Sequence, residues 1–130
     1  MGRKIKFRAW DTVRKVMYVD VQELYDFCPV KADGSYGDRF YESFGDLLMD
    51  ETVVVEQYTG LRDVNGVEVY EGDILDCHAN GECPVVFDAG GFVCKQGSSN
   101  VLLALCIKMQ MGDVVGNIHE GVKEDAVQES

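Results

Sequence analysis

The sequence predicts a mainly β protein in which a small barrel or sandwich follows an N-terminal β-hairpin and a short helix. Short strand-like runs are separated by glycine-containing turns, which is typical of small β-domains. Asn65-Gly66, flanked by β-branched residues, is a strong hairpin signal because both residues tolerate positive φ. At 130 residues the chain also has the length of one domain, with room for a small appendage.

Residues 1–50 are expected to form the smaller N-terminal portion. Residues 3–10 alternate, with Ile5, Phe7 and Ala9 on one face and Lys4, Lys6 and Arg8 on the other. This pattern predicts a half-buried strand whose basic side faces solvent. Residues 15–21 are expected to return as the second strand of a hairpin.

An irregular loop and a short helix are predicted next. Residues 22–37 are poorly patterned and contain Pro29 and two glycines, which favours a loop. Residues 38–50 place apolar side chains at helical spacing: Phe40, Phe44, Leu47 and Leu48. Asp38 is the expected N-cap of this helix, which Gly45 weakens.

Residues 51–120 are expected to form the β-domain. The strand at 52–58 leads into the Asp63–Gly66 turn, and a further strand starts at 72–78. Residues 83–87 and 92–95 then predict a hairpin. With Ala89-Gly90 as its two-residue tip, Val85 faces Cys94.

The apolar run at residues 101–111 is predicted to be a long strand, with a helix as the alternative. Every odd position is apolar, and the even positions are apolar until Cys106. This pattern indicates burial on one face throughout and on both faces in the first half. A last short strand at 114–119 precedes a polar tail, 121–130, that is expected to be flexible.

Charge and composition limit the functions and partners that the sequence allows. The formal net charge is −11, from 12 basic and 23 acidic residues, which disfavours direct nucleic-acid binding. The acidity either keeps the protein soluble or provides a face for a basic partner. No signal peptide or membrane-spanning run is visible, so we expect a cytoplasmic protein with reduced thiols and no membrane partner.

Several blocks of residues resemble the YopX family of phage- and prophage-encoded proteins. In chain order the blocks begin with Ile5–Asp11, Gln57–Leu61 and Asp63–Gly66, and continue with Val69–Ile74 and Gly116–Glu120. The resemblance implies an SH3-like barrel, a phage origin and a bacterial cytoplasm, and it implies no particular reaction. The segment after Glu120 departs from the family pattern.

No catalytic residue, cofactor site or metal site is predicted. Cys77, His78, Cys83 and Cys94 lack the paired spacing of a zinc site, and buried thiols in a β-core fit them better. Asp63-x-Asn65-Gly66 lacks the downstream ligands of a calcium loop, so its side chains are expected to cap the turn. The sequence does not decide whether the cysteines or His119 do more than pack.

The function predicted from sequence is therefore a non-catalytic module that binds an unknown protein partner or self-associates. The candidate partner-binding residues are Tyr58, Arg62, Tyr70 and Glu71, which flank the central turn. Packing of both tyrosines across the hairpin is the structural alternative. Two rival functions remain open: an acidic inhibitor of a basic host nucleic-acid-binding protein, and a thiol-dependent enzyme.

Overall fold

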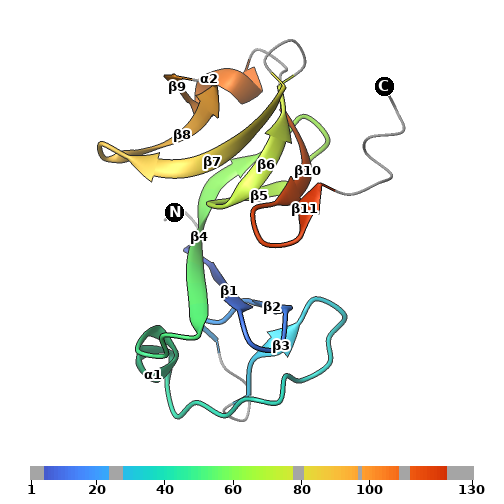
Figure 1. The fold of residues 1–130 in the computed structure, drawn as a ribbon, viewed down its shortest axis with the longest axis vertical. Helices are drawn as coiled ribbons and strands as arrows, with labels where there is room; N and C mark the ends of the chain where they lie inside the picture. The colour runs from blue at the N-terminus through green and yellow to red at the C-terminus, as the bar shows by residue number, and fades with distance from the viewer. Residues whose placement is uncertain (1–4, 24–27, 78–80, 97, 109–111, 123–130) are drawn as a thin grey trace. The chain divides into compact units, whose positions relative to one another are not determined.

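The chain is mainly β, as predicted, and divides into two compact units (Figure 1). The computed structural model describes residues 5–23, 28–77, 81–96, 98–108 and 112–122. Unit 1 is Met1–Tyr58 and unit 2 is Thr59–Ser130. Strand β4, Val53–Arg62, begins in unit 1 and ends in unit 2.

Unit 1 contains the predicted N-terminal hairpin. Strands β1 (Phe7–Asp11) and β2 (Val16–Val19) form this hairpin, and the unit also contains β3 (Val30–Lys31) and α1 (Phe44–Leu48). The strands follow the order β3-β2-β1-β4, with antiparallel pairing throughout. The buried apolar cluster of this unit comprises Ala9, Tyr18, Val21, Tyr41, Leu47 and Val53.

Strand β1 is buried on both faces, so the predicted basic solvent face is wrong. Arg8, expected in water, is buried, and its Nε donates to Glu56 Oε1 at 2.9 Å. Glu56 lies directly opposite Arg8 in the β1–β4 register. A buried arginine is stable only when its charge is paired, and the cross-strand carboxylate supplies that pair.

Helix α1 is shorter than predicted and starts later. Its N-cap is Ser43, whose hydroxyl accepts a hydrogen bond from the Asp46 backbone N–H at 3.2 Å. Asp38, the expected N-cap, lies five residues upstream in an irregular segment. Serine is as good a cap as aspartate, and Gly45 in the first turn limits the helix length.

Unit 2 consists of short antiparallel strands and one helix. After β4 they are β5 (Glu68–Tyr70), β6 (Asp73–Asp76), β7 (Glu82–Asp88), β8 (Gly91–Gln96), β9 (Ser99–Leu102), α2 (Leu103–Lys108), β10 (Asp113–Asn117) and β11 (Gly121–Val122). Strand β5 follows β4 in its sheet, and the second sheet has the order β11-β10-β6-β7-β8-β9. Neither order closes on itself among the described residues, so the SH3-like barrel is not confirmed.

The predicted hairpin at β7 and β8 is confirmed, including its register. Val85 lies opposite Cys94, and Asp88 lies opposite Gly91. Ala89 and Gly90 form the two-residue tip with φ values of 51° and 85°. Positive φ at both central residues is the requirement of the turn that matches strand twist.

The predicted turn between β4 and β5 is also present, but of the Asn65-Gly66 pair only Gly66 adopts a positive φ. The Gly66 backbone N–H donates to the Asp63 carbonyl at 3.0 Å, and Gly66 has a φ of 85°. Asp63 Oδ1 accepts from the backbone N–H groups of Asn65 and Val67. Its Oδ2 accepts from the Val114 N–H at 2.9 Å, which joins the turn to β10.

Two predictions about the C-terminal part are wrong. The predicted strand at 101–111 is β9 followed by α2, which starts at Leu103; residues 109–111 lie outside the described residues. Buried Leu103 and Cys106 are three apart, a helical spacing that a run apolar at nearly every position conceals. Gly121–Val122, placed in the flexible tail, pair with β10 as β11.

Candidate functional site

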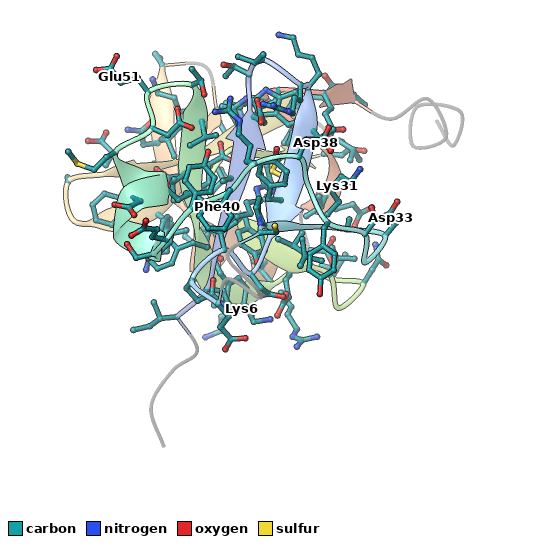
Figure 2. All side chains as sticks on the ribbon, turned by 90° about the horizontal axis from the view of Figure 1, so that it is seen from below. Lys6, Lys31, Asp33, Asp38, Phe40 and Glu51 are labelled. Atoms are coloured by element: carbon teal, nitrogen blue, oxygen red, sulfur yellow. The ribbon has the colours of Figure 1, made fainter. Side chains whose placement is uncertain are left out.

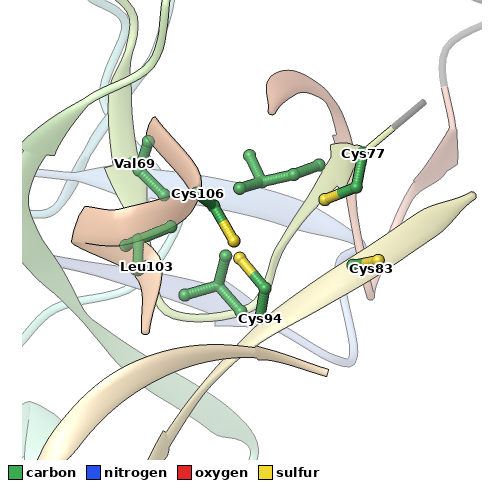
Figure 3. Packing of buried hydrophobic residues seen from close by; sticks show 8 residues of the cluster. Val69, Cys77, Cys83, Cys94, Leu103 and Cys106 are labelled. Atoms are coloured by element: carbon green, nitrogen blue, oxygen red, sulfur yellow. The ribbon is translucent and has the colours of Figure 1, made fainter. Parts of the chain in front are cut away.

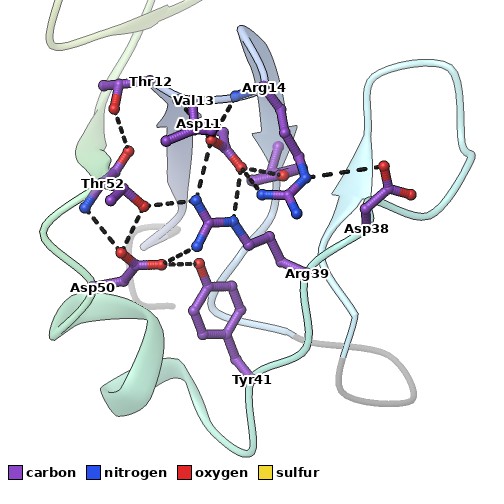
Figure 4. A network of polar contacts seen from close by, with 10 residues as sticks. Asp11, Thr12, Val13, Arg14, Asp38, Arg39, Tyr41, Asp50 and Thr52 are labelled. Atoms are coloured by element: carbon purple, nitrogen blue, oxygen red, sulfur yellow. Dashed lines mark hydrogen bonds and ion pairs between the residues drawn. The ribbon is translucent and has the colours of Figure 1, made fainter.

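A polar network surrounds Asp11 in unit 1 (Figure 4). Asp11 ends β1 and is fully buried. Its Oδ1 accepts hydrogen bonds from the backbone N–H groups of Val13 and Arg14, each at 3.0 Å. Its Oδ2 accepts from the Tyr18 hydroxyl at 2.7 Å and from Arg39 Nε at 3.1 Å. One carboxylate therefore shapes the β1–β2 turn and fixes two side chains from other segments.

Arg39 connects Asp11 to a second carboxylate. Its Nη1 donates to Asp50 Oδ2 at 2.8 Å, and its Nη2 donates to Thr52 Oγ1 at 2.7 Å. The Tyr41 hydroxyl donates to the same Asp50 oxygen at 2.5 Å. The planar guanidinium can serve several acceptors at once, so it joins the segment before α1 to both β1 and the start of β4.

The protonation states of this network suit anchoring better than proton transfer. Burial alone would raise the pKa of Asp11, but hydrogen bonds from a backbone N–H, Tyr18 and Arg39 hold it well below its ordinary value. Hydrogen bonds from Tyr41 and Thr52 lower the pKa of Asp50. Burial and the partner carboxylates raise the pKa values of both tyrosines. None of these groups is suited to exchange a proton near neutral pH.

Residues 40–51, which include α1, expose both apolar and acidic side chains, and the exposed members are called the α1 surface below. The α1 surface comprises apolar Phe40, Leu48 and Met49 together with acidic Glu42, Asp46 and Glu51. The apolar members are exposed by 64%, 53% and 81%, respectively. Figure 2 shows Glu51 projecting outward from the body of the unit.

The geometry of α1 explains why these apolar side chains are exposed. Its only buried residue is Leu47. Successive residues of a helix point about 100° apart, so Leu48 and Met49 cannot share the inward direction of Leu47. Leu48 and Met49 are therefore exposed, and the nearby residues Asp46 and Glu51 are exposed as well.

Four of the five cysteines lie in the core of unit 2 (Figure 3). Cys77, Cys83, Cys94 and Cys106 are all free thiols and all buried. The sulfurs of Cys94 and Cys106 point toward each other between β8 and α2. The apolar side chains around them are Val69, Leu75, Val85 and Leu103.

Burial makes three of these thiols, those of Cys77, Cys94 and Cys106, poor nucleophiles. It raises the pKa of Cys77 to about 11, and contact with Cys83 adds to the effect. Burial also raises the pKa values of Cys94 and Cys106. Such thiols stay protonated at neutral pH, whereas both nucleophilic attack and metal binding need the thiolate. Within the described ranges, no group of three or more His, Cys, Asp or Glu is arranged to hold a metal ion, and His78 lies outside them.

The four predicted binding residues fall in different surroundings. Tyr58 belongs to unit 1 and is buried, with Lys6 Nζ 5.5 Å from its ring centroid. Arg62 is an exposed residue of unit 2, and its Nη2 lies 3.8 Å from Glu68 Oε2. Tyr70 and Glu71 are half-buried in unit 2. Their role in partner binding stays a prediction.

The comparisons with known proteins identify the family. The model of the YopX protein family matches residues 6–123. The chain belongs to the YopX family. A search of curated proteins gave no match. Among solved structures, the chain is similar to the crystal structure of protein EF1440 from Enterococcus faecalis, with 27% identity and a TM-score of 0.61, over 92% of this chain and 96% of that one.

The last block that resembles YopX proteins has a structural explanation in this chain. Asn117 Oδ1 accepts hydrogen bonds from the backbone N–H groups of His119 and Glu120, each at 2.9 Å. A Cβ at Gly116 would lie 2.0 Å from the Gly121 carbonyl oxygen, so a glycine is needed where β10 and β11 meet. The motif therefore shapes the β10–β11 turn.

Sequence reasoning missed the bridging role of Arg39 and the exposure of Met49. Arg39 sits in a segment without periodicity, so no pattern indicated that it joins Asp11 and Asp50. The sequence did contain a clue to the exposure of Met49, because this apolar residue lies next to acidic residues and outside the helical spacing of Phe40, Phe44, Leu47 and Leu48.

No helix within the described part of this YopX-family chain is long and apolar enough to cross a membrane.

Proposed function

We propose that this YopX-family chain is a non-catalytic binding module of phage or prophage origin that works in the cytoplasm of a bacterial host. Its partner is a protein with a basic surface, and the α1 surface of unit 1 provides the contact. The proposal keeps unit 2 as a small SH3-like β-domain, supported by its short antiparallel strands and tight turns. Family membership supports the phage origin.

The composition of the α1 surface is the observation that carries the proposal. Three large apolar side chains are exposed within residues 40–51, although exposed groups of this size cost free energy in water. The exposed charges of the same segment are carboxylates, whereas its neighbour Arg39 is held by Asp11 and Asp50. A basic partner would cover the apolar groups and neutralise the carboxylates together.

Inhibition of a nucleic-acid-binding protein is a second function that the charge favours. A net charge of −11 has the same sign as a phosphate backbone, so the chain would compete for the same basic surface. This function predicts that the captured partner loses its affinity for DNA or RNA when the chain is bound. A mobility-shift assay with the purified partner separates it from simple binding.

A thiol-dependent enzyme is supported least. It needs a thiolate that is accessible to substrate, whereas Cys77, Cys83, Cys94 and Cys106 are buried and the pKa values of Cys77, Cys94 and Cys106 are raised. Cys28 is half-buried in unit 1. The geometry therefore favours packing as the role of the core thiols.

Affinity capture from bacterial lysate, read by mass spectrometry, tests the proposal. The full-length chain should enrich one or a few proteins of high isoelectric point at low salt, and about 0.5 M salt should release them because the pairing is electrostatic. The double variant Leu48→Lys/Met49→Lys should reduce the capture at least about tenfold, since it removes apolar area and lowers the negative charge of the α1 surface.

A matched control distinguishes the α1 surface from a general effect of added charge. Ile118 is 56% exposed in unit 2, so Ile118→Lys adds the same single charge as Met49→Lys alone and, unlike that variant, should leave the capture intact. Equal loss in both variants, or capture of acidic proteins only, would contradict the proposal. Recovery of no protein at low salt would do the same.

A further inference from the structure

Strand β9 ends the second sheet of unit 2 and carries no charge. It comprises Ser99, Asn100, Val101 and Leu102, and it pairs with β8 along one edge. In the strand order of the described residues, no strand follows it on the other edge (Figure 1). An edge strand offers backbone N–H and C=O groups to another strand unless charge, proline or a bulge prevents pairing.

The other edge strands of the molecule are less suited to pairing. Strands β3 and β11 have two residues each, and Lys31 belongs to β3. Strand β5 has three residues and includes Glu68. Strand β9, with four residues, is therefore the longest edge strand in the described part of the chain, and none of its side chains is charged.

The charge around β9 differs from that of the rest of the chain. Residues 89–112 contain two lysines, Lys95 and Lys108, and no acidic residue. With a net charge of −11 overall, the remaining residues therefore carry −13. Two copies of so acidic a chain repel each other wherever carboxylates meet. One carboxylate, Asp88, lies beside β9, where its Oδ2 accepts from Asn100 Nδ2 at 2.9 Å. Apart from this contact, a second copy meets less repulsion here than at the acidic remainder of the chain.

Apolar side chains are exposed at the same place. Leu102 in β9 is 61% exposed, and Leu105 in the following helix α2 is 47% exposed. The inward side of α2 is occupied by Leu103 and Cys106, which belong to the core. Pairing of the edge would bring Leu102 of one copy close to Leu102 of the other and remove both from water.

We propose that β9 pairs antiparallel with β9 of a second copy, giving a two-fold symmetric dimer through unit 2. A two-fold axis places the same strand on both sides, so one self-complementary edge is sufficient. Backbone hydrogen bonds provide the register, and Leu102 and Leu105 provide the apolar contact. The contact is small, so the dimer forms in the micromolar range or above. This inference does not rest on the α1 surface.

Sedimentation equilibrium of the full-length chain, from about 1 to 500 µM, tests the dimer. We expect reversible monomer–dimer exchange that tightens as salt rises, because screening weakens the repulsion between acidic copies. This dependence is opposite to that expected for a basic partner at the α1 surface. Leu102→Lys should raise the dissociation constant at least about tenfold by placing like charges together and removing apolar area.

Two further variants keep the test decisive. Leu102→Thr retains a strand-forming, uncharged residue and should also weaken the dimer, so a folding defect of the lysine variant does not end the test. Ile118→Lys and Leu48→Lys/Met49→Lys should dimerise like the wild-type chain. A monomer across the whole range at low and high salt would overturn the proposal, as would an unchanged dissociation constant in both Leu102 variants.

Discussion

The two units of this chain share a fold class but are held together by different interactions. Unit 1 has a polar centre, in which Arg39 joins Asp11 to Asp50 and two tyrosine hydroxyls donate to these carboxylates. Unit 2 has an apolar centre of aliphatic side chains and four free thiols. No buried side-chain nitrogen or oxygen lacks a hydrogen-bond partner in the described part of either unit.

The difference follows from how much regular structure each unit contains. Between β2 and β4, the described residues of unit 1 (20–23 and 28–52) form only the two-residue β3 and the five-residue α1, so few backbone hydrogen bonds of regular structure fix that segment. Side chains such as Arg39 and Tyr41 fix it instead. In unit 2, successive hairpins satisfy much of the backbone, and the central cluster consists of apolar side chains and thiols, while the buried Asp63, Asp73 and Asn117 are not part of that cluster. A polar network thus substitutes for missing secondary structure.

Removal of the central carboxylate is expected to have the largest effect and to act on unit 1. Asp11→Asn should lower the free energy of unfolding by about 3–5 kcal/mol, because the amide turns a donor toward Tyr18 and Arg39 and leaves the arginine poorly paired. Urea unfolding followed by the fluorescence of Trp10, the single tryptophan and buried in unit 1, measures this change.

Asp38→Asn provides the matched control for that experiment. Asp38 is exposed and lies 3.9 Å from Arg14, so it contributes a surface ion pair to the edge of the same network. Its loss should cost less than about 1 kcal/mol. Equal costs for the two substitutions would contradict the central role of Asp11 and remove the contrast between the units.

A cavity in the core of unit 2 should lower the free energy of unfolding by a similar or slightly smaller amount than Asp11→Asn, and it is measured by a different method. Leu75 is fully buried among the thiols, so Leu75→Ala should cost about 2–5 kcal/mol. Alkylation of the buried cysteines at increasing urea concentration measures the unfolding of unit 2. Leu105 is exposed, so the control variant Leu105→Ala should cost less than about 1 kcal/mol. If Trp10 fluorescence and thiol alkylation shift together in every variant, the two units unfold as one.

Changes of pH should have the smallest effects on stability, and they should act on the two units at opposite ends of the pH range. The folded-state pKa values of Asp11 and Asp50 lie below their ordinary value of 3.8, so their contribution is complete above it and is lost as pH falls through the folded values. The folded-state pKa of Cys77 is raised from 9.0 to about 11, so its contribution is complete below 9.0 and is lost as pH rises toward 11.

Trp10 fluorescence should therefore report weakening of unit 1 below about pH 4, whereas unit 2 weakens first above about pH 9. Tyr18 and Tyr41, with ordinary values of 10.0 and raised folded pKa values, add alkaline sensitivity to unit 1 only beyond pH 10. Alkylation rates should be normalised to the urea-unfolded chain at each pH. A stability of unit 1 that does not change between about pH 5 and pH 2 would contradict the assigned role of its carboxylates.

The sequence predicted those features whose cause is local. The β7–β8 register follows from a two-residue tip of Ala89-Gly90, and the β4–β5 turn follows from Asp63 and Gly66. In both cases the residues that set the backbone geometry are neighbours in the chain. The class of the fold and the family rest on the same kind of local signal.

Tertiary structure alone decided the features that depend on distant partners. Arg8 is buried because Glu56 of another strand neutralises it, and no alternation pattern within β1 can show that partner. Arg39 bridges Asp11 and Asp50 from a segment without periodicity. In the run after Ser99, nearly every position is apolar, so the sequence shows neither a helical nor a strand period there. The helix α2 forms in place of a continued strand because Leu103 and Cys106 pack into the core of unit 2. Local chemistry sets turns and registers, whereas burial of a charge or choice between helix and strand requires the rest of the fold.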